Sequence, residues 1–247
     1  FLESEIMYDE LIDIIKKNNG IVFFGGAGVS TESGIPDFRG KNGIYSMEYE
    51  YSPEDILSRK FFEEKPEEFF RFYRKNILHP NAKPNAAHYA LAKLEKMGKL
   101  SAVITQNIDG LHRAAGSNRV YELHGSVYYN YCIECGKSYS VEYILEGAGI
   151  PRCECGGIIK PDVVLYDEPL DTYIYDMSKA FCECADVLIV GGTSLRVYPA
   201  AGLIDSFMGS RLVIINMDET AFDSKADILI RGSIADVFSI VMDNINR

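Results

Sequence analysis

The chain has 247 residues, of which 47% are hydrophobic and 25% charged, a balance that excludes a disordered or collagen-like protein. Lysine and arginine number 25 against 36 aspartate and glutamate residues, so the formal net charge is −11. Phosphate contacts need a surplus of cations, so we expect no direct nucleic-acid partner. The acidity suits a basic partner or serves solubility alone.

No apolar run approaches the roughly 18 to 20 residues that span a bilayer, so we expect no contact with a membrane. The first residues lack the basic and then apolar pattern of a signal peptide, and we therefore expect a cytoplasmic protein. In such a protein the six cysteines serve metal ligation or burial rather than a disulfide framework.

Amphipathic stretches and short apolar runs alternate along the chain. Helices are predicted over residues 4–18, 85–97 and 234–246, and strands over 21–24, 102–105, 163–166, 187–190 and 212–216. The runs are apolar nearly throughout and contain β-branched or aromatic residues, as in strands buried on both faces of a parallel sheet. This alternation predicts an α/β, doubly wound, Rossmann-like fold.

Two regions break the alternation. Residues 44–83 place tyrosine, phenylalanine and charged residues at helical spacing, and residues 126–160 contain four of the six cysteines. We interpret them as a helical module and a small cysteine-rich module. Both are inserted into a discontinuous Rossmann-like domain formed by residues 1–43, 84–125 and 161–247.

Glycine-rich turns follow two of the predicted strands. GGAGVS occupies residues 25–30 and GGTS residues 191–194. Such turns let the backbone approach a ligand, and the N–H groups that follow can face phosphate oxygens. The first turn departs from the dinucleotide fingerprint because Thr31 replaces its third glycine. A simple strand-to-helix turn remains the alternative, although two such turns together favour a nucleotide site.

Two further polar motifs lie in loops. In IPDFRG (35–40), Arg39 suits a phosphate and Phe38 a ring, or the loop is a turn with a local ion pair. In QNIDG (106–110), polar residues crowd the end of a predicted strand, which is typical of a binding site in this fold class. Asp109 is also interpretable as a helix N-cap.

Histidine 112 and histidine 124 both follow the polar strand end closely. A histidine can act as a base near neutral pH. His79 precedes a proline in a loop, and His88 lies within a predicted helix. The pattern does not choose between His112 and His124.

Four cysteines have the spacing of a structural zinc site: Cys132, Cys135, Cys153 and Cys155. The second pair has one intervening residue instead of the usual two. Cys182 and Cys184 form a rival pair, but alternate positions on a helix do not face each other. We interpret those two as buried or spare thiols.

Six motifs stand in order along nearly the whole chain: GAGVS (26–30), IPDFR (35–39), QNID (106–109), HG (124–125), the cysteine quartet and GTS (192–194). In this combination the sequence resembles the sirtuins, which are NAD-dependent protein lysine deacylases, and its compact length resembles bacterial or archaeal members. The resemblance implies that the discontinuous domain binds NAD and that the quartet binds one structural zinc. NAD and an acyl-lysine protein or peptide would meet in the cleft between the domain and its two inserted modules.

The resemblance also implies roles for individual residues. His124 would be the catalytic base, and Asn107, with Gln106, would contact the reactive ribose and its ordered water. Ile108 and Asp109 would bind the nicotinamide carboxamide. The remaining NAD contacts would come from Ala27, Thr31 and Arg39 at the diphosphate, from Phe38 over the ribose, and from Thr193, Ser194, Asn216, Met217 and Ile234 at the adenosine half. The glycines Gly26, Gly28 and Gly192 would also belong to the NAD site. The peptide would pair as a strand with Val163, Val164, Leu165, Leu195 and Val197.

The implied reaction transfers the acyl group from lysine to ADP-ribose. The acetyl oxygen attacks the ribose carbon as nicotinamide departs, His124 deprotonates a ribose hydroxyl, and water completes the release of O-acetyl-ADP-ribose and free lysine. Desuccinylase-type sirtuins carry a Tyr-x-x-Arg pair after the IPDFR-like loop. Here Glu48 follows Tyr45 at the third position, and Tyr49 and Tyr51 also lack the arginine. We therefore expect an acetyl or another uncharged acyl group.

Three other functions are compatible with parts of the pattern. The first is mono-ADP-ribosylation of protein side chains at the same NAD site. The second is a non-catalytic NAD-responsive binding module, which the presence of His124, Asn107 and Asp109 disfavours. The third is a Rossmann dehydrogenase, which the missing third glycine disfavours.

Overall fold

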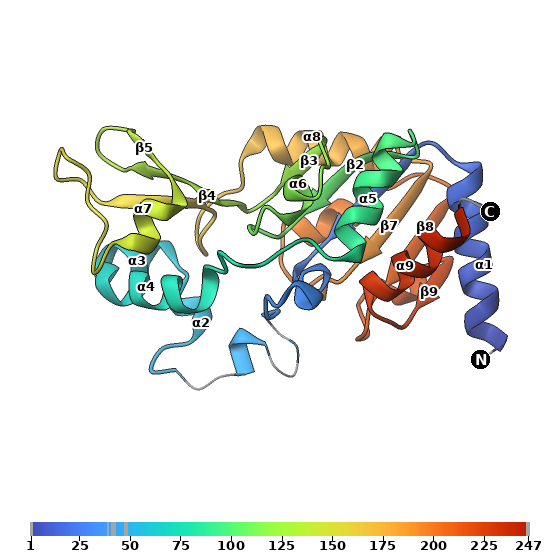
Figure 1. Ribbon diagram of the computed structural model, residues 1–247, viewed down its shortest axis with the longest axis horizontal. Coiled ribbons are helices and arrows are strands. Elements are labelled where there is room, and N and C mark those ends of the chain that lie inside the picture. Colours follow the sequence, from blue (N-terminus) through green and yellow to red (C-terminus); the bar gives the residue numbers. More distant parts are fainter. Residues whose placement is uncertain (1, 39, 41–42, 47–48, 246–247) are drawn as a thin grey trace.

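The computed structural model describes residues 2–38, 40, 43–46 and 49–245. They form two lobes, of which the larger contains a six-stranded sheet in the order β3-β2-β1-β7-β8-β9 (Figure 1). Every pairing in this sheet is parallel, as predicted. Its strands are β1 Ile21–Gly25, β2 Leu100–Thr105, β3 Val120–Glu122, β7 Val187–Gly191, β8 Arg211–Ile215 and β9 Ile228–Ile230.

Helices cover both faces of the parallel sheet, which confirms the Rossmann-like prediction. Alternate residues of a strand point to opposite faces, so in β1 Phe23 and Phe24 enter two different apolar cores. Against Phe23 pack α1 (Leu2–Lys17), α5 (Ala86–Lys96) and α9 (Ile234–Ile245). The opposite core receives α8 (Thr172–Cys184) and the 3₁₀ segment Ala200–Ser206. Figure 1 shows these two layers on either side of the sheet.

The smaller lobe combines the two inserted regions. It contains a three-stranded antiparallel sheet in the order β5-β4-β6, formed by β4 Gly125–Cys132, β5 Ser138–Tyr139 and β6 Ile159–Val163. Its helices are α2 Pro53–Ile56, α3 Arg59–Glu64, α4 Pro66–Phe72 and α7 Val141–Glu146, and a π-helical turn, Tyr73–Ile77, follows α4. One apolar core, which includes Phe62, Phe69 and Ile159, joins the helices to the sheet.

One predicted strand belongs to a different sheet. Residues 163–166 were expected in the parallel sheet, but the strand here is β6, which ends at Val163 and pairs antiparallel with β4. Lys160 and Asp162 interrupt the apolar pattern of β6, so the sequence does not reveal where it begins. The edge strands β3 and β9 have three residues each, too few for a periodic signal.

Among the described residues, no helix combines the length and the apolar character that crossing a membrane would require.

Candidate active site

The two glycine-rich turns meet at the centre of the large sheet. They follow the adjacent strands β1 and β7. From this pair the strand order runs outward in opposite directions, and open α/β sheets bind nucleotides at such a point. The N–H of Gly28 donates to the carbonyl of Gly192 at 2.8 Å. A Cβ on Gly28 would lie 2.8 Å from the Cα of Gly192, and Gly192 itself has a φ of +59°. Only glycine therefore allows the two turns to pack this closely.

Buried hydrogen bonds join the first turn to the polar residues after β2. Asn107 Nδ2 donates to Ser30 Oγ at 3.1 Å, and Ser30 Oγ donates to Asp109 Oδ2 at 2.6 Å. The other oxygen of Asp109 accepts from the N–H of Leu111 at 2.9 Å, where α6 (Leu111–Ala114) begins. Burial raises the pKa of Asp109, and the bond from Ser30 opposes that rise. Asp109 thus precedes Gly110, the N-cap of α6, and bonds to the first N–H of the helix. With Ser30 and Asn107 it forms a polar cluster.

Gln106 connects the second turn to His124. Its Nε2 donates to Thr193 Oγ1 at 3.0 Å, and its carbonyl oxygen lies 3.0 Å from His124 Nδ1. A carbonyl can only accept, so Nδ1 carries the proton and Nε2 of the neutral ring keeps its lone pair. Burial lowers the pKa of His124, and the bond to Gln106 partly offsets this. His124 is therefore neutral near pH 7 and can accept a proton at Nε2.

The other candidate histidine, His112, lies in the core. Its side chain packs against that of His88, with ring centroids 4.7 Å apart, and burial lowers the pKa of His112 well below its usual value. Neither ring nitrogen of His112 has a hydrogen-bond partner among the described residues. Burial likewise lowers the pKa of His88, to about 4. Of the two histidines, His124 is therefore the one with a hydrogen-bonded Nδ1 and a half-buried rather than a fully buried ring.

The two segments predicted to bind a peptide adjoin this cluster. Residue 163 ends β6 and residues 164 and 165 follow it, and the N–H of Val164 donates to the carbonyl of His124 at 2.9 Å. No hydrogen bond to the carbonyl oxygen of Val164 comes from the described residues. Leu195 has a φ of +53°, a buried side chain, and an N–H that donates to Thr193 Oγ1 at 3.2 Å. Val197 is half-buried two residues further on. The first segment thus contacts His124 and the second the GGTS turn.

The loop after the first turn is partly described. Thr31 is exposed, with its Oγ1 donating to the carbonyl of Gly28 at 3.0 Å. Phe38 packs edge-on against Tyr45, with ring centroids 5.8 Å apart, and Ile108 joins the same apolar core of the small lobe. Arg39 and Glu48 lie outside the described residues.

The residues predicted near the adenosine are spread over the edge beside β7. Asn216 follows β8, and its Nδ2 donates to the carbonyl of Asp218 at 2.8 Å. Met217 is exposed and Ser194 is half-buried. Ala27, which was predicted at the diphosphate, is half-buried too. Ile234 is 3% exposed and lies beneath Gly191, where a Cβ would come within 2.5 Å of its Cδ1. Its side chain therefore supports the second turn from the core side.

The cysteine quartet gathers at one end of the small sheet. Its four Sγ atoms lie within 4.8 Å of one another, with Cys132 and Cys155 at 3.5 Å and Cys135 and Cys153 at 3.6 Å. Tetrahedral zinc with Zn–S bonds of about 2.3 Å places its sulfur atoms about 3.8 Å apart. The donor set and spacing therefore fit zinc, although only one residue separates Cys153 from Cys155. In α8, Cys182 is buried and Cys184 exposed, apart from this cluster.

A cavity of about 170 Å³ lies beside Asp109. Ile35, His79 and Tyr128 also line it, so both the loop after the first turn and the small lobe contribute. A wider groove of about 890 Å³ runs along α1 and contains none of the predicted site residues. The cavity beside Asp109 thus agrees with the position of the polar cluster.

Sequence reasoning missed Ser30 as a site residue. It is fully buried and bonds to both Asn107 and Asp109 across 77 and 79 residues of chain. The sequence offered one sign of this role, the position of Ser30 at the end of a glycine-rich turn. Its two hydrogen-bond partners are distant in sequence and can be identified only in the folded structure.

The comparisons with known proteins agree with this geometry. The model of the Sir2 family matches residues 26–199. An NAD-dependent protein deacetylase of Clostridium perfringens is 57% identical over 239 residues, covering 95% of this chain and 98% of the relative. A protein of the same name from Sulfurisphaera tokodaii is 44% identical, with 96% and 95% covered.

Solved structures of Sir2 proteins have the same fold. One described as bound to an acetylated peptide has a TM-score of 0.86 at 40% identity, covering 95% of this chain and 97% of that one. Another, with a peptide and NAD⁺, has a TM-score of 0.85 at 41% identity, covering 95% and 96%. The family match spans more than half of the chain, and the relatives span nearly all of it. The chain therefore belongs to the Sir2 family.

Proposed function

We propose that the protein is an NAD-dependent protein lysine deacetylase. It transfers the acetyl group of an acetyl-lysine protein or peptide to ADP-ribose and releases nicotinamide, O-acetyl-ADP-ribose and free lysine. Curated relatives with up to 57% identity carry this name. The position of His124 is the main structural support, because one residue, Gln106, bonds to both His124 and the second glycine-rich turn.

The polar cluster suits the handling of NAD⁺. When bound, NAD⁺ supplies an electrophilic ribose carbon from which nicotinamide can depart. Asp109, with Ile108, holds the carboxamide of the leaving group, and Ser30 fixes both Asp109 and Asn107. The amide of Asn107, with that of Gln106, orients the ribose and its water. Phe38 shields the ribose, and the two turns with the residues predicted around them hold the diphosphate and adenosine.

His124 acts as the general base. Because the carbonyl of Gln106 accepts a hydrogen bond from Nδ1–H, Nε2 is left to take a proton from a ribose hydroxyl, which then attacks the carbon of the acyl group. Residues 163–165, which we call the acyl-lysine segment, lie against the carbonyl of His124. The carbonyl of Val164, which accepts no hydrogen bond from the described residues, is available to an N–H of the bound acyl-lysine. Leu195 and Val197 take the other side of the peptide.

The four cysteines hold one zinc ion in a structural role. A site with four thiolates leaves no open position, so the zinc supports the fold of residues 126–160 and takes no part in the reaction. Residues 44–83 form the helical module, and residues 1–43, 84–125 and 161–247 the NAD-binding domain. The thiolates require reduced cysteines, which supports a cytoplasmic location.

Product analysis tests the proposal. The protein is incubated with NAD⁺ and peptides that differ only in the acyl group on lysine, and the products are identified by mass spectrometry. Peptides with an acetyl or another uncharged acyl group should be deacylated. Each deacylated peptide should be accompanied by one nicotinamide and one acyl-ADP-ribose. Transfer of ADP-ribose to a protein side chain, without an acyl-lysine requirement, would indicate the alternative activity. His124→Ala should remove acyl transfer.

A further inference from the structure

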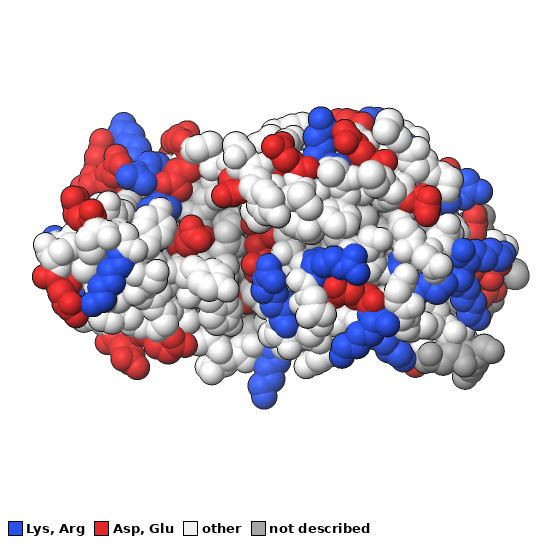
Figure 2. Space-filling view, turned by 90° about the horizontal axis from the view of Figure 1, so that it is seen from above, with Lys and Arg blue, Asp and Glu red and all other residues white. Residues whose placement is uncertain are grey.

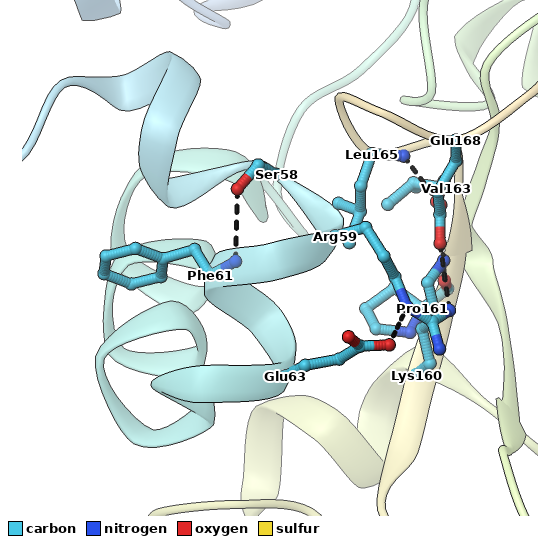
Figure 3. Close-up of polar contacts among 9 residues, drawn as sticks. All are labelled: Ser58, Arg59, Phe61, Glu63, Lys160, Pro161, Val163, Leu165 and Glu168. Carbon is cyan, nitrogen blue, oxygen red and sulfur yellow. Dashed lines mark hydrogen bonds and ion pairs between the residues drawn. The ribbon is translucent and has the colours of Figure 1, made fainter.

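Lys160, Glu168 and Arg59 form a polar network beneath the acyl-lysine segment (Figure 3). Lys160 lies in β6, Glu168 follows the segment, and Arg59 is the first residue of α3, so three separate parts of the small lobe converge here. Lys160 Nζ lies 3.0 Å from Glu168 Oε2, and Arg59 Nη1 donates to Glu168 Oε1 at 3.1 Å. The network lies outside the groups that we assign to the chemistry.

The network bonds directly to the backbone of the segment. Glu168 Oε2 accepts from the N–H of Leu165 at 2.9 Å, and Lys160 Nζ donates to the carbonyl of Val163 at 2.9 Å. These two groups, together with the bond from Val164 to His124, fix all three residues of the segment. Hydrogen bonds thus hold the backbone on both sides of the carbonyl of Val164, and they define where this carbonyl lies relative to His124.

Arg59 connects Glu168 and the acyl-lysine segment to the helical module. Its backbone N–H donates to the carbonyl of Tyr166 at 2.9 Å, and its Nε donates to Glu63 Oε1 at 2.6 Å. Ser58, which precedes Arg59, caps α3 by accepting from the N–H of Phe61 at 3.1 Å. The start of α3 is therefore tied to the acyl-lysine segment through both backbone and side chain.

Two members of the network, Lys160 and Glu168, are largely buried, whereas the side chain of Arg59 is 37% exposed. The side chain of Lys160 is 3% exposed and that of Glu168 15%. Burial raises the pKa of Glu168, but the Leu165 amide, Lys160 and Arg59 outweigh it and lower the pKa overall, so the carboxylate is ionised at neutral pH. A buried ion pair adds little net stability over apolar residues of the same size, whereas it fixes the geometry of the groups that it bonds.

We propose that Glu168, held between Lys160 and Arg59, is a positioning residue that sets the acyl-lysine segment against His124. The inference rests on the proposed deacetylase function for its kinetic test. Glu168→Gln keeps an acceptor for Leu165 but removes the charge that pairs with Lys160 and Arg59. The KM for an acetyl-lysine peptide should rise about 10-fold, while the KM for NAD⁺ stays within about two-fold.

Glu95→Gln is the matched control. Glu95 in α5 is a carboxylate with a 7% exposed side chain that accepts from the N–H groups of Asn118 and Arg119 at 2.8 and 2.9 Å, away from the segment. Its loss should leave both KM values unchanged. An unchanged peptide KM in Glu168→Gln, or an equal rise of both KM values, would overturn the inference. So would the same peptide effect in Glu95→Gln.

Two further measurements keep the test decisive. Lys160→Met removes the donor to Val163 and leaves Glu168 paired with Arg59 alone, and it should raise the peptide KM selectively even if Glu168→Gln fails to fold. Amide hydrogen exchange should be faster at residues 163–166 in either variant and unchanged at residues 26–34. If the wild-type protein does not deacetylate peptides, the proposed function fails, and unchanged exchange at 163–166 would separately overturn the positioning role.

Discussion

At the scale of single residues, the proposed base His124 and the core residue His112 differ in their surroundings. Its Nδ1 bonds to a backbone carbonyl and its Nε2 keeps a lone pair, whereas both nitrogens of His112 are buried without partners among the described residues. The sequence left the choice between them open, because both follow the same polar strand end. They differ in exposure, 2% for His112 against a half-buried His124, and in the hydrogen bond at Nδ1, and both differences are properties of the fold.

The pH dependence of activity should report the pKa of His124. Burial lowers this pKa from its ordinary value of 6.5, and the bond to Gln106 only partly offsets it. The base is active when neutral, so activity is retained above the folded-state pKa and lost as the pH falls through it. A profile of kcat/KM from about pH 5 to about pH 8 should place the acid limb below 6.5. A midpoint above 7 would contradict the assignment.

The buried histidines should make the fold sensitive to acid. Their pKa values in the folded protein lie below 6.5, the value in the unfolded chain. The free energy of unfolding is therefore unaffected above pH 6.5 and decreases as the pH falls toward the folded values, because the unfolded chain then binds more protons. For His88, with a pKa of about 4, the loss amounts to about 3 kcal/mol.

His112→Leu tests this acid sensitivity. The change removes two unpartnered nitrogens at a similar volume, so the denaturant midpoint near pH 7 should be unchanged or higher. The fall in midpoint toward about pH 5 should be clearly smaller than in the wild type. An identical pH dependence in the two proteins would show that His112 does not contribute.

At the scale of elements, the strands that could be predicted are those buried on both faces. Strands β1, β2, β7 and β8 are apolar almost throughout. By contrast, β6 contains Lys160 and Asp162. Lys160 can be buried in this strand because Glu168 pairs with it, and Asp162 is exposed. A side chain that is polar in sequence but satisfied in the fold hides a strand from pattern reasoning.

The same limit applies to the site. Glycine patterns and the sirtuin resemblance located the turns and the polar loop. They did not reveal that Ser30 bonds to Asp109, or that Arg59 reaches Glu168 across 109 residues. These contacts depend on long-range packing, which no local pattern encodes.

Zinc removal should affect the small sheet first. The quartet joins β4, which contains Cys132, to the turn with Cys153 and Cys155, and the small sheet has only three strands. Cys135→Ser should lower the zinc content and the melting temperature, because ligation and folding are coupled. Atomic absorption and thermal unfolding measure this, with Cys184→Ser as the control cysteine. Wild-type protein without stoichiometric zinc would contradict the assignment.

At the scale of the whole molecule, the acidic excess is unevenly distributed along the chain. Residues 161–247 contain 14 acidic and six basic residues, and this part includes both predicted peptide segments. On the face shown in Figure 2, both signs are interspersed rather than separated into single-sign surfaces. On this face, the charge is therefore expected to act by general attraction rather than through one patch.

Salt dependence of peptide binding tests this charge effect. An acetyl-lysine peptide flanked by lysines should have a lower KM than one flanked by glutamates at low ionic strength. The difference should shrink as salt rises, because the screening length falls from about 10 Å at 0.1 M to about 3 Å at 1 M. Equal KM values for both peptides at low salt would show that the acidity serves solubility alone.

The coupling between nicotinamide release and deacetylation tests the central claim most directly. Both products are quantified in one reaction with NAD⁺, with and without an acetyl-lysine peptide, for the wild type and for His124→Ala. We predict equal amounts of nicotinamide and deacetylated peptide in the wild type, little nicotinamide without the peptide, and almost no deacetylated peptide from the variant. Nicotinamide release that is independent of the acetyl peptide, with the peptide left acetylated, would contradict the proposed function.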